Sequence, residues 1–68
     1  MINNLTSRER QVFDLLAEGW KTENIAEKLS ITKNTVKYFT KRIYKKLDVT
    51  SKPELIVRYR FSPNHFNK

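Results

Sequence analysis

The residues of this sequence that are best suited to binding a ligand are lysines and arginines that recur at helical spacing between residues 28 and 47. This stretch of twenty residues contains seven of the fourteen lysines and arginines and neither aspartate nor glutamate. In the rest of the chain seven cations are balanced by seven carboxylates, so the whole formal net charge of +7 lies in this stretch. Such a concentration of positive charge predicts a surface that binds a polyanion.

The composition argues against catalytic and metal-binding chemistry. The chain has no cysteine, one histidine and one glycine, so it offers no nucleophile–base pair, no zinc ligand set and no glycine-rich phosphate loop. Paired carboxylates in a plausible pocket are missing as well. We therefore expect a protein that is not an enzyme and that needs no cofactor or metal.

The length of 68 residues predicts one domain, 1–68, with an ordered core of about 5–60 and a tail, 61–68. A core this small is marginal unless its helices pack well or two copies associate. No apolar run approaches the roughly 18 residues of a membrane span, and the polar start is no signal peptide. We therefore expect a cytoplasmic protein.

The stretch from Lys33 to Leu47 has the pattern of an amphipathic helix. Projected at about 100° per residue, one side collects Val36, Phe39, Thr40, Ile43 and Leu47. The opposite side collects Asn34, Tyr38, Lys41 and Lys45, flanked by Lys37 and Arg42. A cationic face presented on a helix points to duplex DNA among the polyanions.

Two shorter helices are predicted before it. Thr6 and Glu9 have the spacing of a capping box that opens a helix over 7–18, and Gly19 closes it, with Trp20 packing back as a plug rather than stacking on a base. Thr22 is expected to cap a second helix over 23–29. Only Ser30-Ile31-Thr32 separate this helix from the basic one, so the pair makes a helix-turn-helix, with Ile31 buried between the two.

A fourth helix is expected over 52–60, opened by a capping box between Ser51 and Glu54. The residue after the basic helix, Asp48, stands where a left-handed conformation is needed, and Val49 should pack inward. The fold class is therefore all-α, with four helices at about 7–18, 23–29, 33–47 and 52–60.

The chain resembles the LuxR/FixJ-type (GerE-like) helix-turn-helix DNA-binding domain of bacterial transcription regulators. The resemblance covers about residues 5–59 in the family's order and spacing. It is carried by Leu5-Thr6-x-Arg8-Glu9, Leu15-Leu16-Ala17-Glu18-Gly19, Ile25-Ala26-Glu27-x-Leu29-x-Ile31, Thr35-Val36-Lys37, Ile43-x-x-Lys46-Leu47-x-Val49 and Ser51-x-x-Glu54-Leu55. Departures from the common pattern stand at Asn24, Ser30, Tyr38, Phe39 and Asp48.

The resemblance implies that the helix 33–47 enters the major groove and that the fourth helix forms a homodimer contact, here through Leu55, Ile56 and Tyr59. It places DNA contacts at Lys37, Tyr38 and Lys41, with Lys33, Asn34 and Thr35 near the start of the helix. By residue chemistry, Lys37 and Lys41 can reach guanine or phosphate, Asn34 adenine, and Tyr38 a thymine methyl or a phosphate. Backbone contacts or solvation are left for Arg42, Lys45 and Lys46.

Several alternatives stay open at this stage. Glu9 could pair with Lys46 or Arg42 and fix the first helix against the third. The chain could be a sequence-specific regulator, a sigma-factor-like promoter-recognition domain that docks on RNA polymerase, or a basic protein–protein interaction module. It could also be a free-standing regulator or a domain excised from a larger one.

Overall fold

The computed structural model describes residues 4–59, which form four helices and no strand. The helices are α1 (Ser7–Ala17), α2 (Thr22–Leu29), α3 (Lys33–Leu47) and α4 (Lys52–Tyr59). The all-α prediction is confirmed, and the expected helix boundaries that fall within these residues are met to within one residue. Residue 60 and the tail 61–68 lie outside the described part of the chain.

The first helix is bounded by the signals seen in the sequence. The Thr6 hydroxyl accepts from the Glu9 amide at 3.2 Å, and the Glu9 carboxylate accepts from the Thr6 amide at 2.9 Å, which completes the capping box. At the other end Gly19 has a φ of 90° and the Trp20 amide donates to the Leu15 carbonyl at 3.1 Å. This is a Schellman ending, and it brings the half-buried Trp20 against the core.

The turn between α2 and α3 is equally tight. Ser30 adopts a left-handed conformation, with a φ of 59°, and the Ile31 amide donates to the Ala26 carbonyl at 2.9 Å. The Thr32 hydroxyl then accepts from the Thr35 amide at 3.1 Å and caps α3. Ile31 packs against the core but is only half-buried, less than the sequence suggested.

The predicted N-terminal cap of α2 is wrong, and that of α4 is only partly present. Thr22 is the first residue of α2 rather than its cap; Lys21 holds the cap position and forms no side-chain bond there, because lysine has no acceptor. At α4 the Ser51 hydroxyl accepts from the Glu54 amide at 3.3 Å, as expected. The Glu54 carboxylate, however, accepts from the amide and hydroxyl of Thr50 at 2.8 and 2.9 Å, so only half of the predicted capping box forms.

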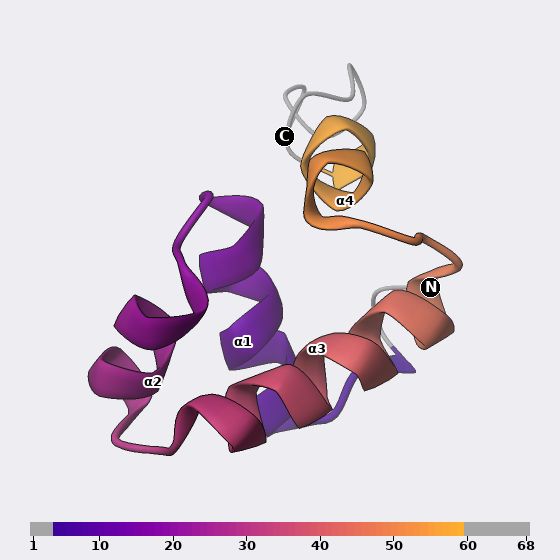
Figure 1. Cartoon of the computed structure of the whole chain (residues 1–68). Helices are drawn as coiled ribbons and strands as arrows, with labels where there is room; N and C mark the ends of the chain where they lie inside the picture. Colours follow the sequence, from indigo (N-terminus) through magenta and orange to yellow (C-terminus); the bar gives the residue numbers. More distant parts are fainter. Residues whose placement is uncertain (1–3, 60–68) are drawn as a thin grey trace.

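The core lies where α1 meets the other three helices, and α2 also packs on α3 (Figure 1). Its buried apolar residues come from all four helices and from the link before α4; they are Val12, Phe13, Leu16, Ile25, Ala26, Val36, Ile43, Leu47, Val49 and Leu55. On α4, the Tyr59 ring meets the Phe13 ring edge-on, with 5.6 Å between centroids. The inner face of α3 thus packs in the core, and its outer face is exposed to solvent.

Across residues 4–59 no helix combines the length and the apolar character needed to cross a membrane.

Candidate nucleic-acid interface

The predicted DNA-facing residues all belong to α3, and the structure brings them onto its outer side. Seven of them are exposed; these are Lys33, Asn34, Lys37, Tyr38, Lys41, Arg42 and Lys45. The eighth, Thr35, is half-buried, and its hydroxyl lies 2.9 Å from that of Thr32. Thr35 therefore contributes first to the cap of α3.

One flank of α3, here called the α1 flank, consists of Arg42 and Lys46 facing Glu9 of α1. The Arg42 Nε donates to Glu9 Oε2 at 2.8 Å, and the Lys46 Nζ donates to Glu9 Oε1 at 2.8 Å. Lys46 also donates to the Asn4 carbonyl at 3.2 Å. Sequence reasoning left open which cation pairs with Glu9, and the structure shows that both do.

Glu9 is the one polar residue among the described buried residues, with 1% of its surface exposed. The hydrogen bond from Lys46 is the largest cause that lowers its pKa to about 2, followed by those from Arg42 and from the Thr6 amide. Burial works against this shift by penalising the charged form. Glu9 therefore remains a carboxylate at neutral pH and ties α1 to α3.

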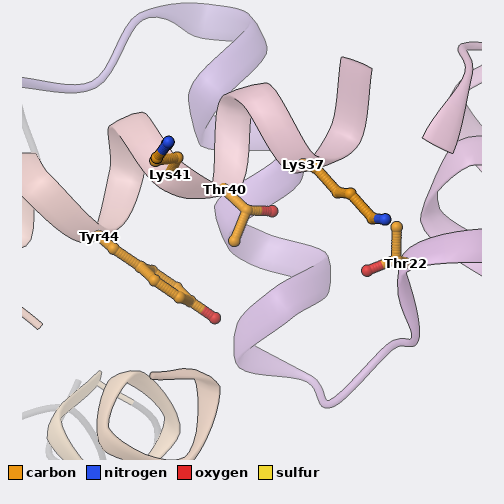
Figure 2. Close-up of a pocket in the computed structure, with 5 residues that line it drawn as sticks. All are labelled: Thr22, Lys37, Thr40, Lys41 and Tyr44. Carbon is orange, nitrogen blue, oxygen red and sulfur yellow. The ribbon is translucent and has the colours of Figure 1, made fainter. Parts of the chain in front are cut away.

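The opposite flank of α3, the α2 flank, borders an open hollow of about 370 Å³. The hollow is lined by Thr22, Lys37, Thr40, Lys41 and Tyr44. Figure 2 shows the Lys37 side chain extended toward Thr22 at the start of α2, and Tyr44 pointing into the space below the helix. The Thr40 hydroxyl oxygen is buried there without a hydrogen-bond partner among the described residues.

Four lysines follow one another along α3 at intervals of one turn and are here called the lysine row: Lys33, Lys37, Lys41 and Lys45. Two of them, Lys37 and Lys41, also line the hollow of the α2 flank. All four are exposed, and none forms an ion pair with a carboxylate of residues 4–59. The row thus differs from Arg42 and Lys46, which both bond the Glu9 carboxylate and share its single negative charge. Ammonium groups at this spacing along a helix can neutralise successive phosphates of a nucleic-acid backbone.

Tyr38 stands out on this face because its side chain is large and 56% exposed. The Arg42 guanidinium carbon lies 5.6 Å from the centroid of its ring, and Arg42 Nη1 lies 3.5 Å from its hydroxyl. Sequence reasoning missed this contact, although the i, i+4 spacing of the two residues on a helix could have indicated it.

The three residues expected at a dimer contact differ in their exposure. Leu55 is fully buried in the core of the single chain, while Ile56 and Tyr59 are half-buried. Val57, which sequence reasoning did not select, is 64% exposed on the same helix.

Comparison with known proteins assigns the chain to a family. The family model for bacterial regulatory proteins of the luxR family matches residues 3–59. The chain belongs to the luxR family. The DNA-binding regulator function expected from the sequence is thereby confirmed at the level of the family, which is a class of transcription regulators rather than of enzymes.

The relatives that this chain matches are named as regulators and are longer than the matched region. The chain is 43% identical over 56 residues to the transcriptional regulatory protein DesR of Bacillus subtilis, covering 82% of this chain and 28% of DesR. It is 41% identical over 56 residues to the nitrate/nitrite response regulator protein NarL of Escherichia coli, covering 82% of this chain and 26% of NarL. It is 43% identical over 51 residues to the probable transcriptional regulatory protein SgaR of Hyphomicrobium methylovorum, covering 75% of this chain and 24% of SgaR. The chain spans about a quarter of the length of these relatives.

Proposed function

We propose that the chain acts as one domain that places α3 in the major groove of duplex DNA, reads a specific sequence there and so regulates transcription in the bacterial cytoplasm. The observation that carries the proposal is the lysine row, which is exposed and without a carboxylate partner among residues 4–59. A major groove about 12 Å wide admits one α-helix with its side chains.

Within this arrangement the residues divide their work. Lys37 and Lys41, one turn apart on the outer face, reach guanine or phosphate, and Asn34 pairs with adenine. Lys33 and the first amides of α3 bind a phosphate, because a helix N-terminus presents unpaired N–H groups. Lys45 follows the backbone further along. If about 4–6 phosphates are neutralised per domain, log K falls against log salt with a slope of roughly −4 to −5.

The proposal includes a homodimer through α4 on paired half-sites. Its support is the exposed Val57 beside the half-buried Ile56, an apolar surface that Leu55 cannot supply from inside the core. An interface this small gains most on DNA, where adjacent half-sites raise the effective concentration of the second domain. Contact with RNA polymerase is the further step by which a bound regulator would act on a promoter.

Selection of bound duplexes from a random pool at moderate salt tests the proposal. The wild type is expected to enrich a motif with two half-sites, and Lys37→Ala to lose or blur it. Arg8→Ala serves as the control, since it removes one exposed cation of α1 whose contact is with Gln11. The absence of any enriched motif, with the wild type and Lys37→Ala binding alike, would contradict sequence-specific recognition.

That negative result would favour the basic protein–protein module, which should bind DNA weakly and without sequence preference. The sigma-factor-like alternative is less favoured, because the matching family model and relatives are those of regulators. A pull-down with RNA polymerase in the absence of promoter DNA distinguishes the sigma-factor-like domain, which should bind the polymerase, from the sequence-specific regulator.

A further inference from the structure

We propose that Arg42 is a positioning residue: held by Glu9 of α1, it fixes the orientation of the Tyr38 side chain on α3, so that Tyr38 reads one base pair of the DNA site. The inference rests on the proposed function, because it assigns a specificity role within the same interface. It also replaces the expected role of Arg42 as a phosphate ligand.

The first step is the anchoring of Arg42. Its Nε donates to Glu9 Oε2 at 2.8 Å, and Glu9 itself is held by Lys46 and by the Thr6 amide within the fold. The guanidinium is planar and rigid, so fixing one edge of it also fixes the direction of its other N–H groups. Arg42 therefore has a set orientation even though its side chain is 45% exposed.

The second step is the contact of Arg42 with Tyr38. Nη1 lies 3.5 Å from the Tyr38 hydroxyl, and the guanidinium carbon lies 5.6 Å from the ring centroid. The neighbouring Phe39 ring meets the Tyr38 ring edge-on, with 5.4 Å between centroids and 68° between planes. A tyrosine that is 56% exposed would otherwise exchange rotamers freely, on a picosecond to nanosecond timescale. Here the Tyr38 side chain contacts both Arg42 and Phe39.

The third step is what this does to the hydroxyl. A guanidinium has only donors, so the Tyr38 oxygen must accept from Arg42, and its own O–H is left to donate outward. In the major groove the acceptors are purine N7, guanine O6 and thymine O4, whereas cytosine presents its amino group. Tyr38 should therefore favour a base with an acceptor at one position and disfavour cytosine there.

Lys46 provides a matched control for Arg42. It bonds the same carboxylate at the same 2.8 Å, so removing either cation takes one partner from Glu9. Of these two cations, only Arg42 contacts Tyr38. A difference in base preference between Arg42→Met and Lys46→Met therefore reports the positioning role of Arg42 separately from its contribution to the stability of the fold.

The experiment is duplex selection with the wild type, Tyr38→Ala, Arg42→Met and Lys46→Met. Tyr38→Ala identifies the base position that depends on Tyr38. At that position Arg42→Met should lower the base preference by roughly 5- to 10-fold, in the range expected for one good base contact, while Lys46→Met retains it. An unchanged preference in Arg42→Met, with weaker binding to all sequences and a smaller salt slope, would make Arg42 a phosphate ligand and overturn the inference.

A measurement without DNA keeps the inference separate from the proposed function. The three-bond couplings between the α and β protons of Tyr38 should report one χ1 rotamer in the wild type and in Lys46→Met, and rotamer averaging in Arg42→Met. Averaging already in the wild type would refute the positioning role. If the wild type enriches no motif, the proposed function fails, whereas these couplings still decide whether Arg42 orders Tyr38.

Discussion

On the α1 flank of α3 a carboxylate that is 1% exposed has both oxygens bonded to cations, whereas on the α2 flank the Thr40 hydroxyl is buried with no partner among the described residues. A buried charge must be paired because its desolvation is far more costly than that of a neutral hydroxyl. Arg42 and Lys46 are therefore committed to the fold. Lys37 and Lys41, which border the hollow of the α2 flank, carry no such commitment.

The difference teaches that the charge counted in the sequence is not the charge offered at the surface. Seven cations lie between residues 28 and 47, but two of them, Arg42 and Lys46, are bonded to Glu9, whose single negative charge offsets one of their two positive charges. Cations with similar spacing along α3 therefore have two different roles. Arg42 and Lys46 hold α3 against α1, whereas the lysine row is available to bind a polyanion.

Removing both cations of the α1 flank should have the largest effect on the stability of the domain. In the double variant Arg42→Met/Lys46→Met, the buried Glu9 carboxylate loses both side-chain partners, and the free energy of unfolding should fall by about 3–5 kcal/mol. Urea denaturation followed by circular dichroism measures this. The matched control is Lys41→Met/Lys45→Met, which removes two charges from the same helix and should leave stability nearly unchanged. Equal losses in the two variants would refute the distinction between the α1 flank and the lysine row.

Acid should remove part of this stabilisation by protonating Glu9. Its pKa is about 2 in the folded chain against an ordinary 4.5, so its contribution is fully present above pH 4.5 and is lost as pH falls toward 2. The loss should be on the order of 1–3 kcal/mol, reduced from the full linkage value because Arg42 and Lys46 are partly exposed. Thermal melts between pH 6 and pH 2 measure it.

Glu9→Gln separates this loss from that of other carboxylates, since the pKa of Glu54 is also lowered, chiefly by its bond from the Thr50 amide. The variant should be less stable at pH 6 and should lose less stability on acidification. A wild type and a Glu9→Gln variant with parallel pH curves would contradict the role of Glu9.

The smallest effect is expected on the α2 flank. Thr40→Val replaces an unpartnered buried hydroxyl by a methyl group of similar size and should stabilise the domain by about 0.5–1 kcal/mol. Thr35→Val is the contrasting variant, because the Thr35 hydroxyl has a partner in Thr32 at 2.9 Å and its loss should destabilise. Differential scanning calorimetry should show a higher Tm for Thr40→Val and a lower Tm for Thr35→Val. Shifts of Tm in the same direction would contradict the prediction.

The helices were predictable because their boundary signals are local. The Thr6–Glu9 capping box, Gly19 and the Thr32 cap each depend on residues within a few positions of one another, and each is present in the structure. Thr22 failed as a cap because α2 begins one residue earlier than its sequence signal suggested. The buried face of α3 followed from its 3.6-residue period.

For the ion pairs between α1 and α3, the sequence suggested Arg42 and Lys46 as candidate partners of Glu9 but could not choose between them. Glu9 is 33 residues from Arg42 and 37 from Lys46, so their pairing depends on how α1 lies on α3. The burial of Leu55 and the exposure of Val57 likewise follow from how α4 docks on α1. DNA contacts by the lysine row and dimerisation through α4 stay predictions that only solution measurements test.

The most direct test of the distinction between the lysine row and the α1 flank is the salt dependence of DNA affinity for Lys45→Met and Lys46→Met, measured on one duplex carrying the selected motif. Each variant loses one lysine of α3, and the two residues are adjacent in the sequence. We expect the slope of log K against log salt to become less negative by about 0.9 for Lys45→Met and to stay at the wild-type value for Lys46→Met. The same change of slope in both variants, or none in Lys45→Met, would contradict this distinction.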